Sequence, residues 1–259
     1  MAMKKVLPAL SALRASVSRP LGVLLVFALS ACSSQDRATS PQEVRSLAGS
    51  SQALQSRKIA EGRLRATVNE YATHTPLTLG LVTLNDVCAG GKAKELFFQS
   101  GDDQYKIRCA LRITAYFGAD PHRMGDVLDG ILTAGDRYAS QHDDSASIPF
   151  HHIDGRSAFV DYYRGTGPNP TGPNLPEPAG LFGRLQSLSW DSVRSTPKKL
   201  IEEASACLQH DPPTTRCLRE PSSKTVSDIR EQFGMVFKLE VPSITYYTVC
   251  KDGKTASAG

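Results

Sequence analysis

A long alternation of apolar and polar side chains, from Tyr105 to Phe117, constrains the fold of this 259-residue chain more than any other feature. Every second residue of the stretch, including Cys109, is apolar or aromatic, and most residues between them are polar or charged. A period of two predicts a strand with one side buried in the core. Glu95–Ser100, joined to it through Gly101–Asp103, is the expected first arm of a hairpin.

A helix is expected directly after this strand. Asp120 and Pro121 suit the N-cap and the first helical position, and the apolar residues of Met124–Leu132 recur at helical spacing. Gly135 is the expected C-terminal stop of the helix. The helix can therefore cover one face of the strand that precedes it.

The other expected elements come in groups rather than in strict β–α–β alternation. They are helices at 52–71, 197–207 and 226–233, strands at 77–84, 158–163, 185–190 and 235–241, and an edge strand at 244–250. Thr225 and Asp228 resemble a capping box before the last helix, and Pro242 is the expected turn between the last two strands. A loop rich in Pro and Gly, 165–180, interrupts them. This grouping predicts an α+β fold, a single disulfide-stapled domain with a largely antiparallel sheet covered by helices on one face.

The N-terminal residues form a separate unit. A basic leader precedes an apolar run of nine residues, Leu21–Leu29, less than half of the ~20 residues that span a bilayer. The following motif, Leu29–Cys32, reads Leu-Ser-Ala-Cys and resembles the lipobox of bacterial lipoprotein precursors. This resemblance implies transfer of a diacylglyceryl group to the sulfur of Cys32 and cleavage of the chain before Cys32.

The lipobox resemblance, together with the polar composition of residues 33–51, predicts an order of segments along the chain. These are a signal peptide at 1–31, a lipidated flexible tether at 32–51, an extracytoplasmic domain at 52–250 and a loose tail at 251–259. The membrane is then a partner through Cys32, on the extracytoplasmic face. Because Ser33 rather than Asp follows the cysteine, the outer membrane is the expected location in a cell with two membranes.

The predicted domain itself loosely resembles uncharacterised envelope lipoproteins. The residues that carry this likeness are Cys88–Gly91, Cys109, Thr114–Gly118 and Gly125–Leu128. The resemblance implies the same extracytoplasmic setting and brings no activity with it.

Removal of the leader changes the charge of the chain. The full sequence has a net charge of +4, from 30 Lys and Arg against 26 Asp and Glu. The four leader charges, Lys4, Lys5, Arg14 and Arg19, are all basic, so the mature chain has a net charge of zero. A neutral domain lacks the electrostatic footprint of a nucleic-acid binder and gains little from anionic lipid head groups.

Six cysteines are present, and five remain if Cys32 carries lipid. Export would place them in an oxidising compartment, where disulfides persist. Two short local loops are the easiest to close, which favours the pairs Cys88–Cys109 and Cys207–Cys217 and leaves Cys250 free. Swapped pairings that involve Cys250 satisfy the same count. No His/Cys spacing typical of zinc is present.

Motifs of the common catalytic classes are absent, so a binding function without cofactor or catalysis is expected. The predicted site is a ligand- or partner-facing edge beside the 165–180 loop, formed by Tyr162, Tyr163, Arg164 and Trp190. The partner would be an envelope protein or a small molecule. The alternative is an extracytoplasmic hydrolase that uses His152 and Asp154, with or without a metal ion, because alternate residues of an extended segment share a side.

Overall fold

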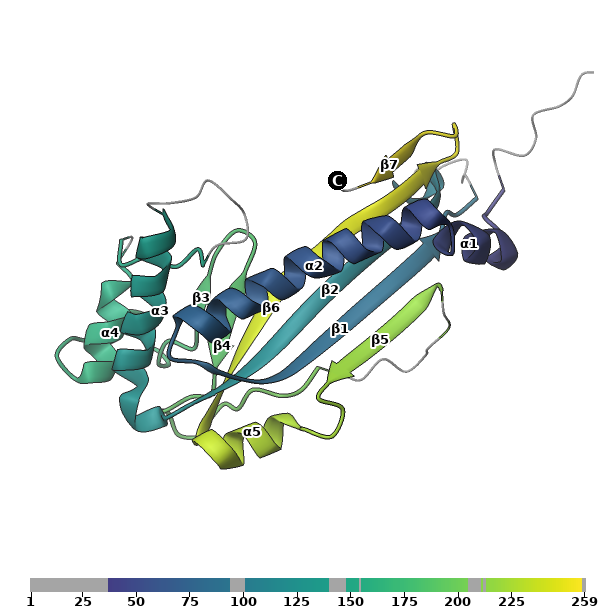
Figure 1. Cartoon of the computed structure of the whole chain (residues 1–259). Coiled ribbons are helices and arrows are strands. Elements are labelled where there is room, and N and C mark those ends of the chain that lie inside the picture. The colour runs from purple at the N-terminus through teal and green to yellow at the C-terminus, as the bar shows by residue number, and fades with distance from the viewer. Residues whose placement is uncertain are drawn as a thin grey trace, which may run out of the picture. The chain divides into compact units, whose positions relative to one another are not determined.

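The computed structural model describes residues 37–93, 101–139, 148–153, 155–204, 211 and 213–257, all of which belong to one compact unit (Figure 1). Three predicted site residues, Cys32, Asp154 and Cys207, lie outside these ranges. Within the described residues, no helix combines the length and apolar character that crossing a membrane requires.

An antiparallel sheet forms the centre of the molecule. In the described part of the chain it has seven strands in the order β3-β4-β6-β2-β1-β5, with β7 paired to β6. The predicted α+β class with a largely antiparallel sheet is therefore confirmed. The strands are β1 (Thr78–Gly90), β2 (Tyr105–Ala119), β3 (Gly180–Phe182), β4 (Ser187–Trp190), β5 (Thr215–Glu220), β6 (Met235–Cys250) and β7 (Thr255–Ser257).

The alternating stretch forms β2, as its period predicts. Cys109, Ile113 and Phe117 are fully buried on the face that contributes to the main core. Strand β2 pairs in antiparallel fashion with β1 on one side and β6 on the other, and the predicted hairpin arm Glu95–Ser100 lies outside the described residues. The disulfide Cys88–Cys109 joins two residues that are directly opposite each other in this pair, so the predicted bridge is confirmed.

The other cysteines follow the predicted pattern where the structure describes them. Cys217 is disulfide-bonded, and its predicted partner Cys207 lies outside the described residues. Cys250 is free, as the sequence favours.

Helix α2 (Ser51–His74) lies across one face of the sheet (Figure 1). It extends beyond the predicted 52–71 helix at both ends. Its buried stripe includes Ala60, Leu64, Val68 and Tyr71. Small residues in this stripe let the helix approach the strands closely, and the main hydrophobic core fills the space between them.

Helix α1 (Pro41–Ala48) lies within residues 32–51, where the sequence predicts a flexible tether. The Ser40 side chain accepts a hydrogen bond from the backbone N–H of Glu43, and Pro41 occupies the first helical turn. Val44 and Ala48 are buried. The helix has only about two turns, so two buried apolar side chains are enough to hold it on the sheet, and the polar composition of the stretch does not reveal them.

Helix α5 (Val226–Phe233) packs on the face opposite α2, which we call the outer face. The predicted capping box at Thr225 and Asp228 is present, and Gly234 ends the helix in the left-handed region. Ile229 packs against Gly80 of β1, and Phe233 packs against Gly118 of β2. The two glycines have no side chains, so α5 can lie close to both strands. The expectation that helices cover only one face is therefore not confirmed.

Helices α3 (Met124–Ala139) and α4 (Ser157–Arg164) pack against each other near one end of the sheet (Figure 1). The predicted cap holds, since the Asp120 side chain accepts from the backbone N–H of His122 in the short 3-10 turn before α3. The predicted stop at Gly135 is wrong: α3 continues past it, and Gly135 leaves room for the backbone of Phe150.

Three other predictions need correction. The strand at 158–163 is wrong, because Val160 and Tyr163 are buried one helical turn apart in α4, which Gly165 caps. The edge strand at 244–250 is part of the interior strand β6, and the predicted turn at Pro242 is a bulge within it. The loose tail at 251–259 contains β7.

The helix predicted at 197–207 is absent from its described part, 197–204. Side chains elsewhere take the backbone N–H groups that a helix would use. The Asp191 carboxylate accepts from the N–H of Ile201 at 2.6 Å, and the Tyr116 hydroxyl accepts from the N–H of Ala204 at 2.8 Å. Tertiary contacts therefore hold this segment extended across the outer face.

Candidate functional site

A groove with a volume of about 1070 Å³ lies on the outer face of the sheet. Its floor includes Gly180, Ser189 and Lys238, which lie opposite one another on β3, β4 and β6. Gly180 and Ser189 present little or no side chain at this position. The Phe182 ring lies against Gly180, and the small side chain of Ser189 leaves the neighbouring part of the sheet low.

One wall of the groove is the Pro- and Gly-rich loop, which is ordered by its own hydrogen bonds. The Asn169 amide donates to the carbonyl of Leu175 at 2.8 Å, and the Thr171 hydroxyl donates to the carbonyl of Pro176 at 2.7 Å. Gly172 has a φ of +128°, which side-chain-bearing residues rarely adopt. These contacts close the loop on itself and present Leu175 at the rim.

Glu177 fixes this loop to the chain that follows β4. Its buried carboxylate accepts hydrogen bonds from the backbone N–H groups of Arg194 at 2.9 Å and Ser195 at 3.0 Å. Buried carboxylates need such donors to offset the loss of hydration. Glu177 therefore has a positioning role, and its charge is already compensated by main-chain amides.

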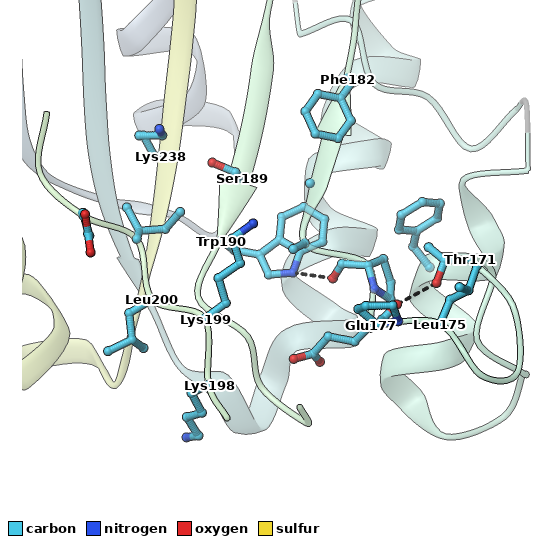
Figure 2. A pocket seen from close by; sticks show the side chains of 17 residues that line it. Thr171, Leu175, Glu177, Phe182, Ser189, Trp190, Lys198, Lys199, Leu200 and Lys238 are labelled. Carbon is cyan, nitrogen blue, oxygen red and sulfur yellow. Dashed lines mark hydrogen bonds between the residues drawn. The ribbon is translucent and has the colours of Figure 1, made fainter. Parts of the chain in front are cut away.

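Trp190 lies at the base of the groove and ties the loop to α4 (Figure 2). Its indole N–H is 3.1 Å from both the Pro178 carbonyl and the Tyr163 hydroxyl oxygen. Burial raises the pKa of Tyr163 far above its ordinary value, and the neighbouring Glu177 charge acts in the same direction. The phenol therefore stays neutral and donates its own hydrogen bond to Pro178.

The second wall is the extended segment 198–202, which presents Lys198, Lys199 and Leu200 to the groove. The N–H of Lys199 donates to the Ser192 hydroxyl at 2.7 Å, and the Lys199 carbonyl accepts from the N–H of Ser192 at 2.8 Å. The Asp191 carboxylate, which Arg230 binds through two nitrogens, holds the next residues. Both walls are thus fixed by residues at or just after the end of β4.

Exposed apolar side chains surround the groove. The exposed fraction is 72% for Phe182, 59% for Leu175 and 47% for Leu200. Scattered exposed apolar residues are ordinary on protein surfaces, but three around one hollow form a patch of the kind that binds a ligand or partner.

Lysine supplies most of the charge in the lining. Within the described residues, Lys198 and Lys199 form no ion pair, and Lys238 lies 3.1 Å from the exposed carboxylate of Glu240. Glu202 adds one exposed acid at the edge, whereas the Glu177 charge is compensated as described. The groove is therefore apolar with a positive side.

The structure brings together only part of the predicted site. Trp190 lines the groove, and Tyr163 lies behind it. Tyr162 is half-buried, and the centre of its ring lies 4.7 Å from the Arg194 guanidinium. Arg164 forms ion pairs with Asp126 and Asp129 on α3. The remaining lining residues escaped sequence reasoning, because residues of three strands and two loops meet only after the sheet is assembled.

His152 is held between two carboxylates of α3. Its Nδ1 is 2.5 Å from Asp136 Oδ2, and its Nε2 is 3.0 Å from Asp129 Oδ1. Desolvation lowers the pKa of His152, but the two hydrogen bonds and carboxylate charges outweigh it and raise the pKa. Both ring nitrogens are occupied, so His152 acts as a clamp between α3 and the segment before α4 rather than as a free base.

The second residue of the predicted hydrolase pair, Asp154, lies outside the described residues. Within the described ranges, no group of three or more His, Cys, Asp or Glu side chains is placed to hold a metal ion. Comparison with protein-family models, curated proteins and solved structures found no match to this chain. Its function must therefore be inferred from its own residues.

Proposed function

We propose that the chain is a lipid-anchored envelope protein whose domain binds a partner or a small ligand in the groove beside Trp190. The observation that carries this proposal is the groove itself, a hollow of about 1070 Å³ whose walls are fixed by hydrogen bonds and whose rim is apolar. Preformed, largely apolar clefts with a few placed polar groups are typical binding sites. No catalytic step is proposed.

The lipobox supports the anchor. If Cys32 is the lipidated first residue, only residues 33–36 separate it from the first described residue, Arg37. A chain of this length spans at most about 18 Å even when fully extended. The domain would then stand close to the extracytoplasmic face of the membrane, which is the outer membrane in a cell with two membranes.

The anchor also bears on the second disulfide. Cys88 and Cys109 are paired with each other, Cys250 is free and Cys217 is bonded. If Cys32 carries lipid, Cys207 is the one partner left for Cys217. A non-reducing peptide map should recover this pair, and a peptide linking Cys217 to Cys32 would contradict the anchor.

Replacing Cys32 with Ser tests the anchor directly. Cys32→Ser should abolish incorporation of a labelled fatty acid and release the protein from membranes, because the acceptor sulfur is gone. Cys250→Ser is the matched control, since it removes a free thiol and should leave labelling intact. Continued labelling of Cys32→Ser would refute the assignment.

Photo-crosslinking tests the groove. A photoreactive phenylalanine analogue at Phe182, on the groove rim, should give a specific adduct in intact cells. The matched control carries the same analogue at Leu54, which is 45% exposed on α2 on the opposite face of the sheet. Equal adducts at both positions, or none at position 182, would remove the groove as the binding site.

A further inference from the structure

We infer that the groove binds a long-chain carboxylate, with its alkyl chain over Ser189 and its carboxylate at Lys199 and Lys238. This inference rests on the proposed function and adds the chemical class of the ligand. It follows from three properties of the lining: an apolar trough, polar groups that already have partners, and ammonium groups on one side.

The apolar trough fits an unbranched chain. Ser189 leaves the floor low, while Phe182, Leu175 and Leu200 rise around it with much of their surface in water. Covering exposed apolar surface of this kind is favourable in proportion to the area removed from water. An alkyl chain laid along the floor would cover the inner sides of these residues.

The polar groups of the lining leave a ligand few hydrogen-bonding partners. The Trp190 N–H, the Thr171 hydroxyl and the Glu177 carboxylate are all bonded to groups within the protein. A bound peptide would bring an amide N–H and C=O with every residue, and amides buried without partners cost free energy. A hydrocarbon chain brings none, so the lining favours a lipid-like chain over a peptide.

The charged groups select an anion. Figure 2 shows the ammonium ends of Lys199 and Lys238 on either side of Ser189 as the groove is viewed, whereas Lys198 is directed away. Among the described residues, Lys199 has no ion pair, and the ion-pair partner of Lys238 is the exposed carboxylate of Glu240. A ligand carboxylate between the two ammonium groups would be stabilised by both. Because Glu240 offsets part of the Lys238 charge, Lys199, Lys238 and Glu240 together have a formal charge of about +1. A carboxylate carries one negative charge, whereas a phosphate monoester carries about −1.5 to −2 near neutral pH, so this charge favours a carboxylate head group.

The sole tryptophan of the chain, Trp190, reports binding at this place. A stearic acid brominated at mid-chain should quench Trp190 fluorescence in a saturable way, because bromine quenches only nearby indoles. Unbrominated stearate should displace it. The brominated methyl ester, which has the same chain without the charge, should bind several-fold more weakly.

Three variants assign the contacts. Lys199→Gln combined with Lys238→Gln should weaken binding of the acid about tenfold, because both charge contacts to the carboxylate are lost, and should leave binding of the ester unchanged. Lys58→Gln, an exposed lysine on α2, should change neither. Ser189→Leu, which fills the floor, should weaken binding of both, with an unchanged circular dichroism spectrum as evidence of folding.

The outcomes separate this inference from the proposed function. Equal binding of acid and ester, an unaffected double lysine variant, or tighter competition by stearyl phosphate than by stearate would overturn the carboxylate class while leaving the groove as a binding site. Absence of quenching by the acid would overturn the inference as well. The adduct at position 182 then decides independently whether the groove binds a different partner.

Discussion

At the scale of single residues, the most consequential contact lies under α2. Asp86 is 1% exposed; Arg57 Nε lies 2.6 Å from its Oδ2, and the Tyr246 hydroxyl donates to its Oδ1 at 2.9 Å. Burial raises the pKa of Asp86, and the charge of Arg57 opposes this only in part. The ionised carboxylate is therefore tolerated because Arg57 is present rather than because the pair is strongly favourable.

Loss of Arg57 should expose this dependence. In Arg57→Met the Asp86 carboxylate stays buried, and the cation that remains beside it is the more distant Arg216. The free energy of unfolding near neutral pH, measured in urea, should therefore fall by about 3 kcal/mol. Without Arg57, the pKa of Asp86 in the folded variant lies further above its unfolded value of about 4. The variant therefore loses stability as pH increases above that value. The deficit should therefore shrink in acid.

Two further variants complete the comparison. Arg45→Met breaks an exposed pair with Asp211 and should cost less than about 1 kcal/mol. Adding Asp86→Asn to Arg57→Met should recover part of the lost stability, because it removes the unpaired charge. A deficit that is independent of pH and of Asp86 would contradict this account and assign the loss to packing.

The deficit caused by loss of His152 should change with pH in the opposite direction to the deficit of Arg57→Met. Its pKa is raised in the folded state by Asp136 and Asp129, so its contribution to stability is complete below its ordinary pKa of about 6.5 and is lost as pH rises through the raised value. The melting temperatures of the wild type and His152→Gln should therefore differ most at about pH 6 and converge in alkali. A constant difference across this range would contradict the charged clamp.

At the scale of elements, glycines determine where helices can lie on the sheet. Because Gly80 and Gly118 have no side chains, α5 packs closely on one end of the outer face. Further along this face, the extended segment 198–202 and the Pro- and Gly-rich loop border the groove. The groove therefore exists because α5 is short and no second helix follows it on this face within the described residues. The helix predicted at 197–207 would have occupied that space.

Two glycine substitutions should act in opposite directions. A methyl group at Gly118 would collide with the Phe233 ring, so Gly118→Ala should destabilise the protein by about 1–3 kcal/mol. Gly62, within α2, has no neighbouring atom within 4 Å of an added methyl group, so Gly62→Ala should stabilise by about 1 kcal/mol. Thermal unfolding measures both, and a Gly118→Ala protein as stable as the wild type would contradict the close packing of α5.

At the scale of the whole molecule, local patterns predict local structure well. The alternation of Tyr105–Phe117, the cap at Asp120 and the box at Thr225 each require only neighbours in sequence, and each is confirmed. The failures have non-local causes: Asp191 and Tyr116 take backbone donors that a helix at 197–204 would need. A sequence pattern cannot reveal hydrogen bonds to partners that only folding brings near.

The candidate site shows the same division. Trp190 and the Pro- and Gly-rich loop are recognisable from the sequence, because a long loop beside aromatic residues favours a binding role. Phe182, Lys199 and Lys238 are far apart along the chain and meet through the strand register of β3, β4 and β6 and the path of the 198–202 segment. Register is set by the assembled sheet.

The central claim is that the groove beside Trp190 is occupied in the cell envelope. Native mass spectrometry of the protein released gently from membranes tests it most directly, with the wild type and Ser189→Leu prepared in parallel. The expected result is a bound mass on the wild type, of a partner or of a long-chain carboxylate, that is lost when leucine fills the floor. The same bound mass on both proteins, or none on either, would contradict it.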